Sequence, residues 1–251
     1  MKTAFVDFNH AKEARGLRLV TVANIPSPWS EAAKGIFRVK NIPFVATRLE
    51  PGDKAMREWT RARNAPVAMY DDEPGRTGWV EILELAERLA KAPSLVPSAP
   101  NDRVRFFGLA HELMSEGGLL WSARIATIDA GFASEGARGF PVPIGQYLGK
   151  RYGYAKERVE HAKKRVLEGL GLLREALGTK EYYFGKELTA LDIYSAAATN
   201  LFALPPDENC AVWPPIRAAF ESMRDEFEAP PELVAHRDRM YERHLELPIV
   251  L

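Results

Sequence analysis

The chain has 251 residues, 46% of them hydrophobic, and its 34 Lys and Arg balance its 34 Asp and Glu. This length allows one or two domains with a substantial core. Net neutrality argues against proteins that bind nucleic acids or membrane surfaces, because both need a basic excess, and no apolar run approaches the ~20 residues of a membrane span. Cys210 is the single cysteine, so no disulfide can form within the chain, which favours a reducing, cytoplasmic location.

The first sixteen residues mix charged and apolar types and are interpreted as an N-terminal extension. Residues 17–24 are apolar and rich in β-branched types, which predicts a buried strand. Residues 30–41 have the spacing of an amphipathic helix. Pro28 suits the first helical position, because its missing N–H would be unpaired there anyway, and Ser27 is then the N-cap. An ordinary cap is one interpretation of Ser27; a site that stabilises an anion, including a thiolate, is the other.

A proline precedes the next apolar run, residues 67–70. Pro66 cannot donate a hydrogen bond to a sheet, and a cis Ala65–Pro66 peptide, which turns the preceding backbone outward, would explain its place. A polar turn follows over residues 71–75, and residues 79–89 then show helical periodicity. The order is therefore strand, helix, strand, polar segment, strand, turn, helix.

Residues 91–100 contain three prolines and are expected to link two domains. Helices follow. One long stretch is interrupted at Gly117–Gly118, and the clearest amphipathic helix spans 154–177. Thr189 is expected to cap a later helix, with the Asp192 carboxylate reaching back to its backbone N–H, a structural role. Two Pro-Pro pairs, at 214–215 and 230–231, predict two more helix starts.

Three motifs in this order resemble the glutathione S-transferase superfamily: Ser27-Pro28-Trp29-Ser30, Ala65-Pro66, and the capping segment 184–193. The resemblance covers nearly the whole chain after the first sixteen residues. It implies an α/β plus all-α protein. A thioredoxin-like domain with a mixed four-stranded sheet would occupy residues 17–90, and an all-helical bundle residues 101–251.

The same resemblance implies a site for glutathione as co-substrate, with Ser27 as the catalytic residue. The residues that it places around glutathione are Trp29, Ser30, Arg63, Asn64, Ala65, Pro66, Glu81 and Ile82, and those beside a second-substrate pocket are Trp121 and Arg124. Ala65 would pair through its backbone with the cysteinyl unit. Ile82 departs from the family, which has Ser or Thr after the acid. A lost charge-assisted hydrogen bond would cost about 1.5–3 kcal/mol of glutathione binding.

The implied reaction is attack of the glutathione thiolate on a small electrophile, as in detoxification, by a cytoplasmic homodimer. A non-catalytic binding or assembly module is one alternative, favoured by Ile82, since fold does not fix function. A glutathione-dependent lyase, isomerase or dehalogenase is another. Ser27 and Ser30 stand where dithiol redox enzymes need cysteine, and the five histidines lack metal-ligand spacing, so neither dithiol chemistry nor a metal is expected.

Overall fold

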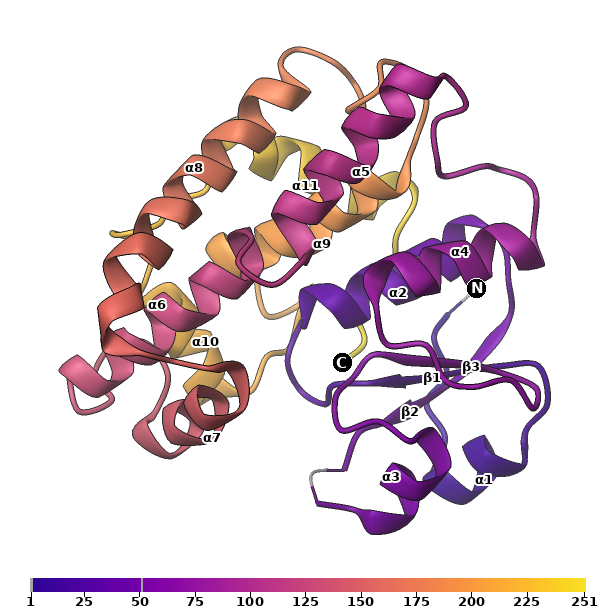
Figure 1. The fold of residues 1–251 in the computed structure, drawn as a ribbon, viewed down its shortest axis with the longest axis horizontal. Coiled ribbons are helices and arrows are strands. Elements are labelled where there is room, and N and C mark those ends of the chain that lie inside the picture. Colours follow the sequence, from indigo (N-terminus) through magenta and orange to yellow (C-terminus); the bar gives the residue numbers. More distant parts are fainter. Residues whose placement is uncertain (1, 51) are drawn as a thin grey trace.

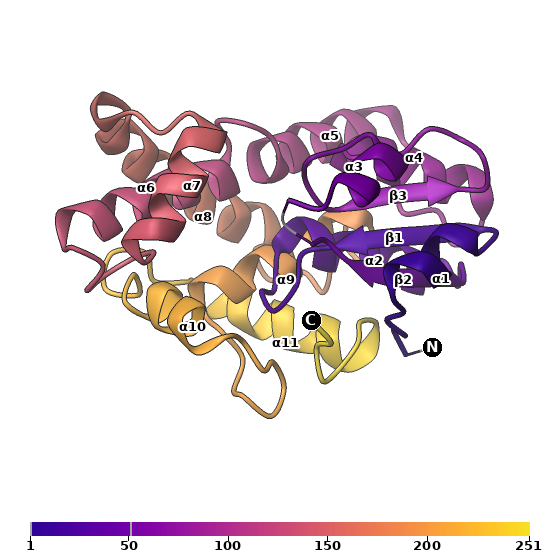
Figure 2. The same ribbon diagram turned by 90° about the horizontal axis from the view of Figure 1, so that it is seen from below.

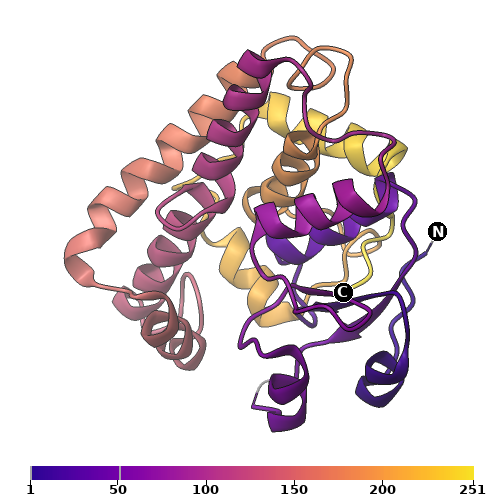
Figure 3. The same cartoon turned by 45° about the vertical axis from the view of Figure 1, so that its right-hand side comes forward.

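The computed structural model describes residues 2–50 and 52–251. A small sheet with its flanking helices, the sheet part, lies beside a bundle of helices, the helical part, in all three views (Figures 1, 2 and 3). Among the described residues, none of the helices has the length and apolar character needed to cross a membrane.

The sheet part contains α1 (Phe8–Glu13), β1 (Leu17–Thr21), α2 (Pro28–Val39), β2 (Phe44–Arg48), α3 (Lys54–Thr60), β3 (Val67–Tyr70) and α4 (Trp79–Leu89). The strand order is β2-β1-β3, with β1 parallel to β2 and antiparallel to β3. This mixed arrangement confirms the thioredoxin-like class. In the described chain the sheet has three strands, and a bridge between Ala68 and Arg76 takes the place of the fourth. Pro74 cannot donate to a ladder and α4 begins at Trp79, which leaves little chain to pair.

Every residue of β1 is buried, because helices cover both faces of the sheet (Figure 1). Leu17 and Leu19 pack in one core cluster with α2 and α4. Val20 points the other way and joins a smaller cluster with α3 and α1. This alternation is the period-2 pattern of a strand, and burial on both faces explains why Leu17, Leu19 and Val20 of β1 are all apolar.

The helical part contains α5 (Pro100–Met114), α6 (Leu119–Ala133), α7 (Val142–Tyr152), the short 3-10 helix η1 (Lys156–Arg158), α8 (Val159–Leu177), α9 (Ala190–Phe202), α10 (Pro214–Glu221) and α11 (Pro231–Arg243). Almost all of α9 is buried, and it packs against α11, α5 and α2. The contact with α2 joins the two parts. It requires Gly35, since a Cβ there would lie 2.7 Å from Cγ2 of Ile193.

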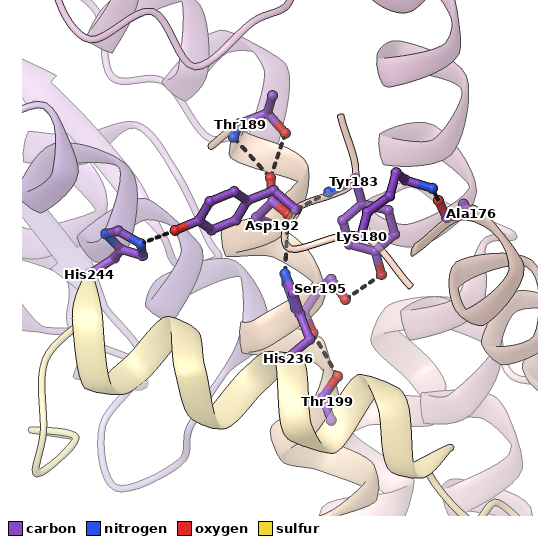
Figure 4. A network of polar contacts seen from close by, with 10 residues as sticks. Ala176, Lys180, Tyr183, Thr189, Asp192, Ser195, Thr199, His236 and His244 are labelled. Atoms are coloured by element: carbon purple, nitrogen blue, oxygen red, sulfur yellow. Dashed lines mark hydrogen bonds and ion pairs between the residues drawn. The ribbon is translucent and has the colours of Figure 1, made fainter. Parts of the chain in front are cut away.

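A buried carboxylate fixes the start of α9 (Figure 4). Asp192 Oδ2 accepts hydrogen bonds from the backbone N–H of Thr189 at 2.9 Å and from its hydroxyl at 2.8 Å. The other oxygen accepts from the backbone N–H of Tyr183 at 2.9 Å and lies 3.1 Å from His236 Nε2. The predicted bond between Asp192 and the Thr189 N–H is confirmed. The carboxylate organises the fold and lies away from the candidate functional site.

Candidate functional site

A cavity of about 690 Å³ lies between the N-terminal end of α2 and helices α6, α7 and α10. This volume is typical of sites for small molecules. Its lining is mainly apolar and comes from both parts of the chain. Tyr147 and Trp213 line the cavity while being 56% and 49% exposed, so they stand at its rim.

Ser27 lines this cavity as the N-cap of α2, with Pro28 in the first turn, as the sequence predicts. Its backbone N–H donates to the Ile25 carbonyl at 2.7 Å, and its own carbonyl accepts from Glu31 at 2.8 Å. The side chain, in contrast, makes no capping bond to the helix. The hydroxyl is therefore available to a ligand at the positive end of α2.

The loop before β3 lines the cavity with Arg63, Asn64 and Ala65. The Ala65–Pro66 peptide bond is cis, as the sequence predicts. Among the described residues, the N–H and C=O of Ala65 take part in no hydrogen bond. Arg151 of α7 reaches across from the helical part and donates to the Arg63 carbonyl and to Asn64 Oδ1. The backbone N–H and C=O of Ala65 are thus unpaired in the cavity wall, and α7 is tied to the same loop through Arg151.

Four of the residues predicted to bind glutathione do not line this cavity. Ser30 is 1% exposed, and its hydroxyl accepts from the Val22 N–H at 3.2 Å. Pro66 and Ile82 border a much smaller internal space, and Ile82 belongs to the main core. Glu81 uses Oε2 to accept from the Gly78 N–H at 2.9 Å, which caps α4.

The reason for these positions is the register of α4. This helix begins at Trp79, the first residue of the periodic segment 79–89 that the sequence predicts. Glu81 therefore takes the third helical position and Ile82 the inward-facing fourth. Two other groups lie at the start of α4. Thr77, just before the N-cap Gly78, carries a hydroxyl. The N–H of Trp79 belongs to the first turn, so it has no partner within the helix.

Arg124 of α6 lines the cavity among aromatic rings. Its guanidinium lies 4.0 Å from the ring centre of Tyr152, 4.7 Å from that of Trp29 and 5.5 Å from that of Trp121. Trp121 stacks edge-on against Tyr152 at 5.3 Å but does not line the cavity itself. Burial lowers the pKa of Arg124 from its usual value, and an arginine remains protonated at neutral pH even so.

A scan against protein-family models found no match, and neither did a search of curated proteins. Solved structures do match. A glutathione S-transferase of Methylobacterium radiotolerans, in complex with glutathione sulfonate, has a TM-score of 0.60 at 17% identity, covering 90% of this chain and 91% of that chain. A Pseudomonas fluorescens family member with two glutathione bound has a TM-score of 0.62 at 15% identity, covering 91% and 89%. The Tau class enzyme of mango has a TM-score of 0.52 at 16% identity, covering 90% and 98%.

The chain has the glutathione transferase fold. At these identities the likeness establishes the fold, and the function must be argued from the site. Within the fold, the structure gathers six of the predicted residues around one cavity, namely Ser27, Trp29, Arg63, Asn64, Ala65 and Arg124.

Sequence reasoning missed that two elements of the glutathione transferase fold, α7 and the start of α10, line the cavity. Helix α7 supplies Arg151 and Tyr152, and the segment that begins α10 supplies Trp213. Signals for α7 exist, since Pro143 lies in its first turn and Gly153 ends it with a φ of 68°. These signals mark the ends of a helix but do not say which face would meet a ligand.

Proposed function

We propose that this cavity binds glutathione and that Ser27 donates a hydrogen bond to its sulfur. The observation that carries the proposal is the unpaired Ser27 hydroxyl, which lies at the start of α2 and lines the same cavity as the unpaired peptide group of Ala65. Glutathione is a short peptide with a thiol, so it needs a backbone partner for its central unit and a stabilising group for its sulfur.

The energy of the thiolate agrees with this role. Holding a thiol ionised at neutral pH needs a pKa decrease of about two units, or ~2.7 kcal/mol. A hydrogen bond to a charged acceptor contributes about 1.5–3 kcal/mol, and a helix N-terminus adds roughly 0.3–1 kcal/mol. Together these suffice without a further base. The thiol proton goes to solvent, the sulfur forms a bond to the electrophilic atom, and a leaving group departs with the electrons of the bond that breaks.

We assign the rest of glutathione to residues in and beside the cavity. Ala65 would pair with the cysteinyl N–H and C=O. Arg63, an exposed cation on the cavity wall, would meet the glycyl carboxylate. The γ-glutamyl carboxylate would lie at the start of α4, which borders the smaller space beside Trp29; free N–H groups there favour an anion, and Thr77 offers a hydroxyl. Because Ile82 lies in the core, its missing hydroxyl does not count against glutathione binding.

The remaining expectations belong to the same proposal. They are the homodimer, the cytoplasmic location, a role in detoxification, and the division into domains at residues 17–90 and 101–251. Light scattering would test the dimer, since a stable interface of about 800 Å² per partner survives dilution to micromolar concentration. A chain of 28.1 kDa that stays a monomer there would contradict it.

Calorimetric titration tests the function. We expect the protein to bind glutathione with a dissociation constant below the millimolar range, and to bind an analogue with a methyl group in place of the thiol more weakly at slightly alkaline pH. Ser27→Ala should abolish this preference while still binding both ligands, because the peptide contacts remain. If the wild-type protein binds neither ligand at millimolar concentration, the cavity serves another purpose, and the non-catalytic module becomes the better interpretation.

A further inference from the structure

Arg124 is a cation in the cavity wall that pairs with no other side chain except aromatic rings among the described residues. Among the described residues, Arg124 makes no hydrogen bond or ion pair, and its contacts are with aromatic rings. The guanidinium nitrogen atoms of Arg124 are not fully buried. Because Arg124 lines the cavity, a ligand there can reach them. A positive charge in an apolar wall is costly to leave uncompensated. The site therefore favours an anion beside Arg124.

The other charges around the cavity do not supply that anion. Four arginines line it, against one glutamate, Glu50. Arg48 donates to the Leu251 carbonyl at 3.1 Å through Nε, and Arg151 is tied to the loop at Asn64. Arg63 is the residue proposed for glutathione. Arg124 is thus the cation left for a second ligand.

The surroundings of Arg124 are apolar and rich in flat rings. The aromatic residues that line the cavity are Trp29, Phe140, Tyr147, Tyr152, Phe202, Trp213, Phe220 and Phe227. Rings stack well against other rings, and a guanidinium held by aromatic faces keeps its fork of N–H groups in a fixed plane. A planar carboxylate fits such a fork with two parallel hydrogen bonds.

We propose that the second substrate of this protein is an aromatic electrophile that carries a carboxylate, and that Arg124 recognises the carboxylate. This inference rests on the proposed function, since it concerns the partner of glutathione in the same cavity. Arg124 is the specificity-determining residue. The carboxylate lies on the guanidinium, the ring lies among the aromatic side chains, and the reactive carbon faces the sulfur near Ser27.

A matched pair of substrates tests the charge. One is the chloronitrobenzoate with chlorine para to the carboxylate and the nitro group ortho to chlorine; the other is its neutral carboxamide. In both, the thiolate forms a C–S bond, the C–Cl bond breaks and chloride leaves. For each substrate the enzymatic rate is divided by the rate of its uncatalysed reaction with glutathione. This division removes the difference in intrinsic reactivity between the carboxylate and the carboxamide. We expect the wild-type enzyme to favour the carboxylate by about tenfold or more in kcat/KM.

Variants assign this preference to Arg124. Arg124→Gln should lower kcat/KM for the carboxylate by about ten- to a hundredfold and leave the carboxamide within about threefold. Arg124→Lys should keep part of the preference, because it retains the charge but loses the fork. Arg103→Gln is the matched control: Arg103 also lies over an aromatic ring, Phe107 at 5.0 Å, but does not line the cavity. Equal losses with both substrates in Arg124→Gln would overturn the proposal.

Two further measurements separate the possible failures. Calorimetry without glutathione compares unreactive analogues of the two probes, with methyl in place of chlorine. The carboxylate should bind more tightly to the wild-type protein and lose that advantage in Arg124→Gln, whether or not glutathione binds. Equal binding of the two analogues to the wild-type protein overturns the inference and leaves the proposed function intact. Failure of glutathione binding, with the carboxylate preference kept, overturns the proposed function and leaves Arg124 as the carboxylate-recognising residue of a cavity with another role.

Arg124 could instead stabilise the thiolate itself. The ultraviolet absorbance of bound glutathione, followed against pH, measures the pKa of its thiol. Our proposal requires the same thiol pKa in the wild-type protein and in Arg124→Gln. A raised pKa in the variant, with equal losses for both substrates, would move Arg124 from substrate recognition to thiolate stabilisation.

Discussion

Replacing Ser27 by alanine separates a helix cap from a catalytic hydroxyl. The Ser27 side chain makes no hydrogen bond to the backbone of α2. Losing a working N-cap costs about 0.5–2 kcal/mol, so this substitution should lower the free energy of unfolding by less than about 0.5 kcal/mol. If the hydroxyl instead donates to a thiolate, one charge-assisted bond is lost, worth about 1.5–3 kcal/mol.

The loss of the hydrogen bond from Ser27 to the thiolate should appear in the kinetics. We expect kcat/KM for conjugation to fall by about ten- to a hundredfold in Ser27→Ala and the pKa of the bound thiol to rise by about one to two units. Steady-state rates with a neutral electrophile and the thiolate absorbance measure the two effects, and urea denaturation measures stability. Ser27→Thr keeps the hydroxyl and should keep most of the rate.

Ser30→Ala provides the contrast for stability. It leaves the Val22 N–H without its acceptor, so we expect a loss of about 1–3 kcal/mol in the free energy of unfolding. The reasoning on Ser27 is refuted if Ser27→Ala conjugates as fast as the wild-type protein with an unchanged thiol pKa. A large drop in its stability would show that the side chain caps α2 in solution.

Three more predictions follow from the contacts described. Ile82→Ser should lower the free energy of unfolding by about 2–5 kcal/mol in urea without tightening glutathione binding, because Ile82 is buried; a gain in affinity would return it to the binding site. Burial tends to raise the pKa of Asp129, but bonds from Lys156 and Tyr154 outweigh it and hold the pKa below its ordinary value. The stability that this carboxylate contributes is present above about pH 4 and lost as pH falls further, so Asp129→Asn should show a shallower loss of stability in acid than the wild-type protein. Arg151→Ala should speed hydrogen exchange in α7, whose buried residues are two glycines; unchanged exchange would show that the tie to Asn64 does not hold the helix.

Features with a local physical cause were predictable from the sequence. Pro28 lies in the first turn of its helix because its ring fixes φ and it lacks an N–H. The Pro-Pro pairs begin α10 and α11 for the same reason. The capping box at Thr189 needs only side chains three positions apart. Each of these predictions is confirmed.

Features that depend on register and on distant contacts were not predictable. The family resemblance places Glu81 and Ile82 beside glutathione, but in the register of α4 Glu81 caps the helix and Ile82 lies in the core. Nothing near Arg124 in the sequence shows that Trp29 and Tyr152 meet it, since these residues come from three separate helices. The contribution of α7 to the cavity was missed because the short apolar pattern of this helix does not show which of its faces meets a ligand.

The close contact at Gly35 has a consequence for engineering. The helix that begins at Ser27 is also the one on which α9 rests, and only a hydrogen atom fits between Gly35 and Ile193. The sheet part and the helical part are therefore not interchangeable modules joined by a linker. A chimera that takes its bundle from a relative would hold the serine in position only if the incoming helix presented an equally close surface to α2. Grafting a new specificity onto this scaffold is better done by changing residues on the walls of α6, α7 and α10 than by exchanging the whole bundle.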